Sequence, residues 1–292
     1  MYAISPAGLV PAVLFFAAAL PAASQPSLTA RQVIERIRDH IGVPWNDETV
    51  DTFKEGDPDT PISGIAVTMM ATYAVLEQAA AAGLNLVITH EPTYFAHLDE
   101  ITPLAAVDDP VFRAKQALIE KHGLVVWRFH DHWHRRNPDG ILEGMIEALD
   151  WGAYREADGE AVFRIPEKSL RDLAAYVRDR LDIRTLRVVG EADLAVSKAA
   201  LAPGFTGFER HRDLLARDDV EVLVMGEAHE WETIAYAADA VSAGMKKALI
   251  VMGHTPSEQE GMRNAADWLR TFVSEVPVEF VPAEEPFWRE DL

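Results

Sequence analysis

The sequence of 292 residues contains no cysteine. Disulfides, Fe–S clusters, thiolate zinc sites and cysteine nucleophiles are therefore excluded. Basic residues are also scarce, with 27 Lys and Arg against 47 Asp and Glu, which gives a formal net charge of −20. Because such a chain lacks the positive surface that attracts phosphates and anionic lipids, we expect no nucleic-acid partner and no electrostatic binding to a membrane.

The signatures of several enzyme classes are missing as well. The chain has no Gly-x-Ser-x-Gly elbow, no Walker loop and no Gly-x-Gly-x-x-Gly fingerprint. No motif therefore supports a serine hydrolase, a phosphate-loop NTPase or a dinucleotide-binding protein. What is present is an ordinary globular composition, with 49% hydrophobic and 25% charged residues. Such a chain is long enough for one large core or two smaller ones.

The N-terminus differs from the rest of the chain, because the first 24 residues contain no Asp, Glu, Lys or Arg. The apolar stretch from Ala7 to Leu20 is shorter than the roughly 20 residues that span a bilayer, and it leads into small residues that end at Ser24. We interpret residues 1–24 as a signal peptide that exports the protein, most simply to a bacterial periplasm, with no membrane span left after cleavage. The missing basic residue and Pro11 leave a non-cleaved anchor or a misassigned start codon as alternatives.

A repeating unit organises the remaining chain after a capped first helix that begins at Thr29. Each unit has a helix, a Gly or acidic turn, a short run rich in Val, Leu and Ile, and then a cluster of His and Glu. The apolar runs cover residues 84–89, 124–129, 220–225 and 248–252. Helices that alternate with continuously apolar strands predict an α/β fold with mostly parallel or mixed sheets.

The four units fall into two pairs, which predicts two related α/β lobes. We place them at residues 25–150 and 151–292, separated by a more polar stretch over about 151–197, and note that the C-terminal segment could pack on the first lobe instead. Alternating residues at 63–69 and 185–190 predict the first strand of each lobe. The cleft between the lobes is the expected place for a ligand site.

All the His and Glu clusters follow an apolar run. The residues are His90, Glu91, His130, His132, His134, Glu227, His229, Glu230, His254 and Glu258. Because the carboxyl ends of parallel strands meet at one edge of a sheet, we expect these groups to converge. Imidazole and carboxylate donors without thiolates favour one or two divalent cations such as Zn, Mn, Fe, Co or Ni.

Less specific interpretations exist for two of the clusters. The segment Thr255-Pro-Ser-Glu258 is also a capping box, with the helix beginning between His254 and Glu258. His90 and Glu91, which precede Pro92, could equally lie in a solvated loop.

The remaining histidines are of two kinds. His130, His132 and His134 alternate, so in an extended segment all three would point to one face. The other histidines have no such partners, and we expect them at the surface: His40, His97, His122 and His211.

Three segments together resemble the Nif-three-like family, the GTP cyclohydrolase I type 2 homologues, over about residues 30–282. They are residues 84–95, residues 222–227 and the pattern Gly253-His254-x-x-x-Glu258. The resemblance implies a pair of metal ions held by a His-His dipeptide before Pro, an Asp four residues after a strand-end His, and a late His and Glu. The matching positions here are His90, Glu91, His134, His254 and Glu258, with His130 as the strand-end histidine of the predicted set.

Two exchanges distinguish this chain from the family pattern. Glu91 replaces the second histidine of the dipeptide, and His134 replaces the aspartate, so the set still contains three His and two carboxylates. A small shift in loop register would make Asp131 or His132 the ligand in place of His134.

The resemblance and the ligand chemistry lead to a metal-dependent hydrolase of an unknown small-molecule substrate. Glu91 or Glu258 would bridge two cations that activate water, and Glu227, His229 or Glu230 would act as the catalytic proton shuttle. The alternative is a non-enzymatic metal-binding or metal-delivery protein. The family also implies a homo-oligomer, often a ring of six, and its members are mostly cytosolic, so export would be a further departure.

Overall fold

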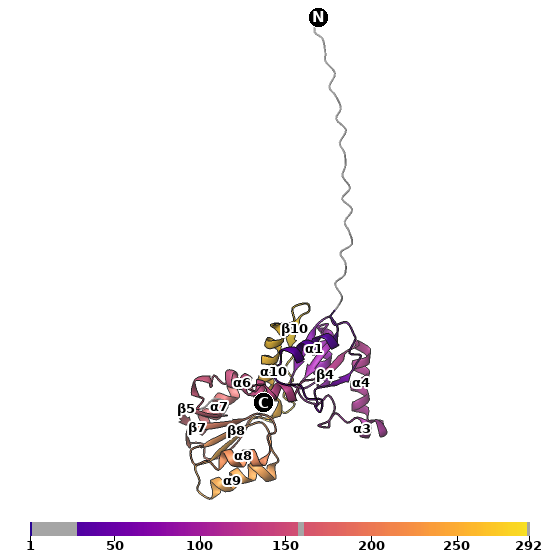
Figure 1. Ribbon diagram of the computed structural model, residues 1–292. Coiled ribbons are helices and arrows are strands. Elements are labelled where there is room, and N and C mark those ends of the chain that lie inside the picture. Colours follow the sequence, from indigo (N-terminus) through magenta and orange to yellow (C-terminus); the bar gives the residue numbers. More distant parts are fainter. Residues whose placement is uncertain (2–27, 157–160, 291–292) are drawn as a thin grey trace.

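The computed structural model describes Met1 and residues 28–156 and 161–290. Apart from Met1, the predicted signal peptide lies outside these residues. Within them, no helix has the length and apolar character needed to cross a membrane. Two α/β lobes lie side by side, which confirms the predicted fold class (Figure 1).

The first lobe is built around one mixed sheet with the strand order β1-β4-β3-β2-β10, in which only β1 is antiparallel to its neighbour. Its elements are α1 (Ala30–His40), β1 (Phe53–Glu55), β2 (Ile65–Thr68), α2 (Tyr73–Ala81), β3 (Leu86–Thr89), α3 (Thr102–Ala106), α4 (Pro110–His122), β4 (Val125–Arg128), α5 (Asp131–Arg135), α10 (His254–Arg270) and β10 (Val278–Phe280). Because β10 pairs with β2, the C-terminal segment returns to this lobe.

Successive side chains of the buried strands point to opposite faces of this sheet, and helices pack on both faces. In β2, Ile65 packs in the core that contains residues of α1 and α10, whereas Ala66 packs against α2 and α4. The first helix is capped as predicted, since the Thr29 hydroxyl accepts from the Gln32 amide and the Gln32 side chain accepts from the Thr29 amide. The result is a three-layer arrangement that buries every strand of the parallel core.

The second lobe has the strand order β5-β7-β8-β9-β6, with a parallel centre and antiparallel edge strands. Its elements are α6 (Gly140–Ala148), the 3₁₀ turn η1 (Gly152–Tyr154), β5 (Val162–Ser169), α7 (Leu170–Leu181), β6 (Arg187–Val189), β7 (Ala195–Ala202), α8 (Phe208–Leu215), β8 (Val222–Met225), the π-helix η2 (Glu230–Ile234), α9 (Ala235–Ser242) and β9 (Ala248–Val251).

One prediction about the second lobe was wrong. The polar stretch 151–197 contains β5, α7, β6 and the start of β7, so the lobe begins with a strand that the sequence patterns did not indicate. Residues 187–189 form an antiparallel edge strand rather than the first strand of the lobe. Edge strands expose part of their length to solvent, so β5 carries Arg164, Glu167 and Lys168 and has too few apolar residues to resemble the buried strands.

Helices α6 and α10 cross where the two lobes meet (Figure 1). A Cβ on Gly144 would lie 2.6 Å from the Gly261 Cα, and one on Gly261 would lie 2.5 Å from the Ile141 Cα. Only glycine permits this approach of the two backbones. Since α6 packs in the second core through Met145 and α10 packs in the first through Met262, the crossing ties the lobes together next to the strand ends.

Candidate metal centre

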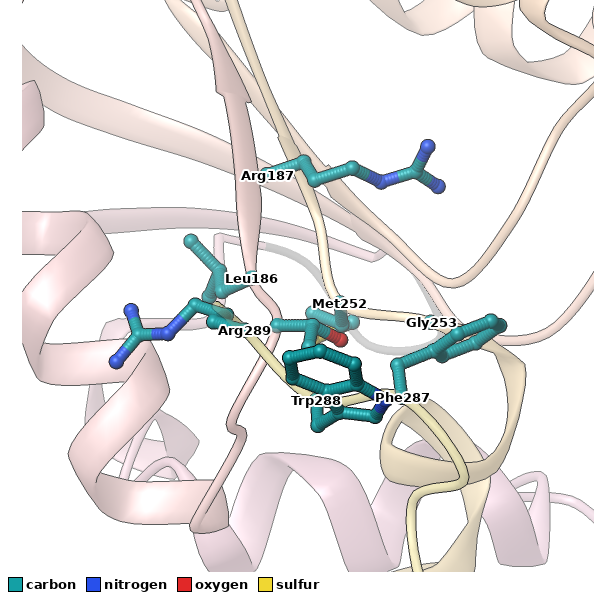
Figure 2. Close-up of a pocket in the computed structure, with 8 residues that line it drawn as sticks. Leu186, Arg187, Met252, Gly253, Phe287, Trp288 and Arg289 are labelled. Carbon is teal, nitrogen blue, oxygen red and sulfur yellow. The ribbon is translucent and has the colours of Figure 1, made fainter. Parts of the chain in front are cut away.

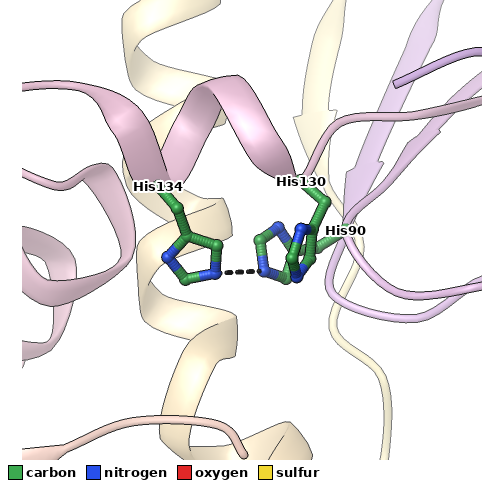
Figure 3. A group of neighbouring side chains, drawn as sticks. All are labelled: His90, His130 and His134. Carbon is green, nitrogen blue, oxygen red and sulfur yellow. Dashed lines mark hydrogen bonds between the residues drawn. The ribbon is translucent and has the colours of Figure 1, made fainter. Parts of the chain in front are cut away.

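His90 and His130 each follow the carboxyl end of a parallel strand, β3 and β4 respectively. Their rings converge with that of His134, as Figure 3 shows, and the Nε2 atoms of His90 and His134 are 3.2 Å apart. His90 is fully buried, so the alternative of a solvated loop was wrong. The sequence order of helix, strand and histidine therefore brings the groups together as predicted from parallel-sheet geometry.

The histidine triplet does not lie in an extended segment, because His132 and His134 are in the short helix α5 and His130 is its N-cap, and this corrects the expected common face. His130 and His134 are four residues apart and share one side of the helix, whereas His132 points away. Both nitrogens of His132 already have partners, since Nδ1 bonds to Asp51 at 2.6 Å and Nε2 accepts from the Asn46 amide at 2.9 Å. His132 is thus a structural residue and not the alternative ligand.

The buried carboxylate of Asp51, which sequence reasoning missed, caps the N-terminus of this helix. Asp51 accepts the backbone amides of His130, Asp131 and His132 at 2.6, 3.0 and 2.9 Å. The first amides of a helix have no partner within the helix, so Asp51 satisfies them from another part of the chain. No local signal could have identified Asp51, because its partners lie about 80 residues away in sequence.

In each converging histidine, the Nδ1 atom forms a hydrogen bond with a group outside the centre. His90 Nδ1 lies 3.0 Å from the Phe129 carbonyl oxygen, and His130 Nδ1 lies 2.9 Å from Asp131 Oδ1. A carbonyl can only accept, so His90 Nδ1 carries the proton and Nε2 presents a lone pair inwards. Such outer partners are what orients histidine ligands of metals. Asp131 therefore orients His130 rather than acting as the alternative ligand.

His134 is oriented by Asp139, whose Oδ2 lies 3.0 Å from its Nδ1. The other oxygen of Asp139 accepts the amides of Ile141 and Leu142 and so caps α6. Asp139 was not among the predicted residues. Its place directly before the apolar run of α6 is a typical N-cap signal and could have indicated at least the capping role.

The two late residues face the histidines from the start of α10. His254 Nε2 lies 3.2 Å from Glu258 Oε2 and 3.3 Å from Glu91 Oε1, and His90 Nε2 lies 3.6 Å from Glu258 Oε2. The helix begins at His254, so the predicted capping box at Thr255 was wrong. Because no cap is formed there, Glu258 is available to the centre, and it forms an i,i+4 pair with His254.

Glu258 is enclosed by backbone that only glycine permits. A Cβ on Gly204, whose φ is +66°, would lie 2.1 Å from Glu258 Oε1. The opposite oxygen, Glu258 Oε2, is buried and makes no hydrogen bond in the described chain, and its nearest polar neighbours are the Nε2 atoms of His254 and His90 at 3.2 and 3.6 Å. A buried carboxylate that faces two imidazole nitrogens without a hydrogen bond is a donor set that a cation can satisfy.

Two histidines of the centre, His90 and His254, differ in charge. Burial first, and then the neighbouring His134 and His130, lower the pKa of His90 well below its ordinary value, so this imidazole is neutral and able to coordinate. Burial alone would lower the pKa of His254, but Glu227, Glu258 and Glu91 outweigh it and raise the pKa to about 12. Without a metal, His254 is therefore the cation among these carboxylates.

The second-lobe loops bring one predicted catalytic residue to the centre and leave two outside it. Glu227 Oε1 lies 3.6 Å from His254 Nδ1, and its side chain is half exposed. His229 pairs with Glu232 at 3.2 Å, whereas Glu230 pairs with Arg187 at 3.0 Å and is 74% exposed. Glu227 is thus the one member of this predicted group that faces a predicted ligand.

The prediction of surface positions held for His40, His97 and His122 but was wrong for His211. His211 is buried, and its ring bridges the hydroxyls of Thr206 and Thr233 at 2.8 and 2.9 Å. It lies on the core-facing side of the amphipathic helix α8, where hydroxyl partners replace the water that an imidazole would otherwise need.

Within the described residues, two groups of side chains could each hold a metal ion. They share His90, and the ligand atoms within each group lie within 4.8 Å of one another. The groups are His90, His130 and His134, and His90, Glu91 and Glu258. Nitrogen and carboxylate donors of this kind fit Zn, Mn, Fe, Co or Ni.

Known proteins share this arrangement of the chain. A curated GTP cyclohydrolase 1 type 2 homolog of Clostridium perfringens is 20% identical over 240 residues, which are 79% of this chain and 86% of that one. The solved Bacillus cereus protein related to NIF3 is 14% identical, with a TM-score of 0.68 over 90% of this chain and 99% of that chain. A Staphylococcus aureus hypothetical protein matches with 15% identity, a TM-score of 0.65 and the same shares of both chains.

These likenesses to solved structures concern the fold, because so few residues are identical. The sequence itself matches one protein family over residues 33–286, a range that includes every ligand candidate. The resemblance inferred from the strand-end motifs is thereby confirmed, and the chain belongs to the Duf34/NIF3 (NGG1p interacting factor 3) family.

Proposed function

We propose that this protein is a metal-dependent hydrolase with two divalent cations. The ligands are the six side chains that converge at the strand ends: His90, Glu91, His130, His134, His254 and Glu258. The observation that carries the proposal is the convergence of the buried Glu258 Oε2, which makes no hydrogen bond in the described chain, with the Nε2 atoms of His90 and His254 at 3.6 and 3.2 Å. Glu91 and Glu258 would supply the carboxylate oxygens that hold the cations.

Divalent cations at such a site lower the pKa of water to near neutrality and polarise the group to be cleaved. The chain supplies the other requirements. Asp51 and Asp139 hold the histidines in place, and Gly204 closes the backbone over Glu258 and shields it from water. Glu227, half exposed and next to His254, is the residue that we assign to moving protons between the substrate and solvent.

The test is metal content and turnover measured on the same preparations. Mature protein purified without chelator is analysed for metals, loaded with Zn, Mn, Fe, Co or Ni, and assayed with phosphoesters, cyclic amides and nucleotides. We expect the variants His90→Ala and His254→Ala to lose metal and activity together. His122→Ala is the matched control, because His122 is exposed at the end of α4, and it should retain both.

Less than half an equivalent of metal per chain in the wild type would overturn the two-cation site. Stoichiometric metal without turnover on any substrate class would instead support the metal-binding or metal-delivery protein. Export and assembly into a homo-oligomer belong to the same proposal. Cleavage after Ser24 can be read from the N-terminal sequence of the exported protein, and the oligomer size from sedimentation.

A further inference from the structure

A cavity of about 400 Å³ lies at the carboxyl end of β9, where the chain enters α10. It is bounded by β6, by the carboxyl end of β9 and by the C-terminal segment that follows β10 (Figure 2). Gly253, which lines it, is the residue before His254. The cavity therefore lies one residue along the chain from a candidate ligand, at the carboxyl end of β9, where open α/β sheets bind ligands.

The walls of this cavity are apolar and aromatic. Phe287 and Trp288 are 64% and 75% exposed and belong to neither core, while Leu186 and Met252 line the cavity from the sheet. Figure 2 shows the Phe287 ring on the Gly253 side of the cavity and the Trp288 ring in front of Met252, whereas Arg289 points away from Arg187. Large aromatic side chains left in solvent beside a cavity are typical of a binding site.

The C-terminal segment is held against the sheet and does not depend on its aromatic residues for its position. Glu285 accepts the backbone amides of Arg184 and Thr185 at 2.7 and 3.1 Å. This clamp lies three residues before Trp288. The indole is therefore kept at the cavity by polar contacts elsewhere, and its exposed face is free to contact another molecule.

We propose that this cavity receives a planar aromatic part of the substrate, whose hydrolysable bond then reaches the metal centre. The proposal rests on the proposed function. The volume of the cavity lies within the range of about 300–1,000 Å³ that small-molecule sites occupy. Aromatic walls favour a flat ring, which stacks on an indole with little loss of conformational freedom. Arg187, held by Glu230 at 3.0 Å, provides hydrogen-bond donors at the rim for polar ring substituents.

The decisive experiment measures binding without turnover. Metal-free full-length mature protein is titrated calorimetrically with 2-naphthalenesulfonate and with cyclohexanesulfonate, which has the same charge but no aromatic ring. We expect the naphthalene compound to bind more tightly, and Trp288→Ala to weaken it roughly tenfold. Trp288→Phe should restore most of the affinity. Tyr73→Ala is the control, because Tyr73 is an exposed aromatic residue that lines a different cavity.

Equal binding of the two compounds, or equal naphthalenesulfonate affinity in the wild type and Trp288→Ala, would overturn the cavity assignment. So would a change in sedimentation on Trp288→Ala, because Trp288 would then lie between copies of the chain. If no hydrolysis is found with any substrate while the titration succeeds, the enzyme proposal fails and the aromatic site stands. If turnover is found, 1-naphthyl phosphate should show a raised KM in Trp288→Ala and cyclohexyl phosphate should not.

Discussion

The two lobes share an architecture but differ in what their strand ends carry. The first sheet has four adjacent parallel strands and the second has three, and helices cover both faces of each sheet. In the first lobe the strand ends carry His90, which is buried, and His130, which is mostly buried. In the second lobe they carry Glu227 and His229, each about half exposed.

The difference lies in how rigidly the side chains are held. His90 and His130 are held through Nδ1, and their Nε2 atoms converge. Among the described residues, Glu227 forms an ion pair with His254. A cation needs several donors in fixed positions, whereas proton transfer and substrate binding need access to solvent. The same fold thus provides a rigid ligand set on one lobe and an accessible surface on the other.

The largest expected effect comes from removing a first-lobe ligand. Structural zinc sites with four ligands bind with about 10–16 kcal/mol, so losing one ligand should cost roughly 3–4 kcal/mol, or several hundred-fold in affinity. We expect His90→Ala to show this loss in a chelator-competition titration. An affinity within tenfold of that of His122→Ala would contradict the assignment.

The next effect concerns the residue that positions the ligands. Asp51→Asn keeps the size of the side chain but removes the charge that accepts three amides and the His132 ring. We expect metal affinity to fall about 10- to 100-fold, the usual cost of losing an outer partner. Asp139→Asn retains a good helix cap, so its loss of metal affinity should lie near the low end of that range. Unchanged affinity in Asp51→Asn would show that α5 holds its shape without it.

A pH dependence distinguishes the buried histidine of the second lobe. Burial lowers the pKa of His211 to about 4, below the ordinary value near 6.5. Between these values the unfolded chain binds a proton that the folded chain does not, so His211 makes stability fall as the pH drops through this window. As the pH falls from 8 to 5.5, His211 lowers the free energy of unfolding by about 1.4 kcal/mol. Urea unfolding of the wild type and His211→Asn should differ in pH slope by this amount, and parallel slopes would refute the assignment.

The smallest effect on the metal should come from the second-lobe carboxylate. Glu227→Gln removes a charge 3.6 Å from His254 but no proposed ligand. We expect metal affinity to change less than about tenfold, since outer partners of this exposed kind are partly screened by solvent. The same chelator competition provides the measurement. A loss as large as that in His90→Ala would make Glu227 a ligand and would remove the contrast between the lobes.

Sequence patterns identified the elements with strong local signals. The buried strands at 86–89, 125–128, 222–225 and 248–251 are continuous apolar runs, and the cap at Thr29 is a local motif. The edge strand β5 was missed because its burial comes from pairing with β7 and not from its own composition. His211 was misplaced because its hydroxyl partners are Thr206, in the loop before α8, and Thr233, in the π-helix η2.

By itself, the sequence determined the kind of site. With no cysteine, any metal centre must be built from imidazole and carboxylate, and these groups stand where parallel strands end. Only the tertiary structure decided which of them meet. His132 is separated from its neighbours because Asp51 begins a helix there, and Glu258 is turned inward because α10 starts at His254. Both outcomes depend on hydrogen bonds and backbone contacts between segments far apart in the chain, which no local pattern encodes.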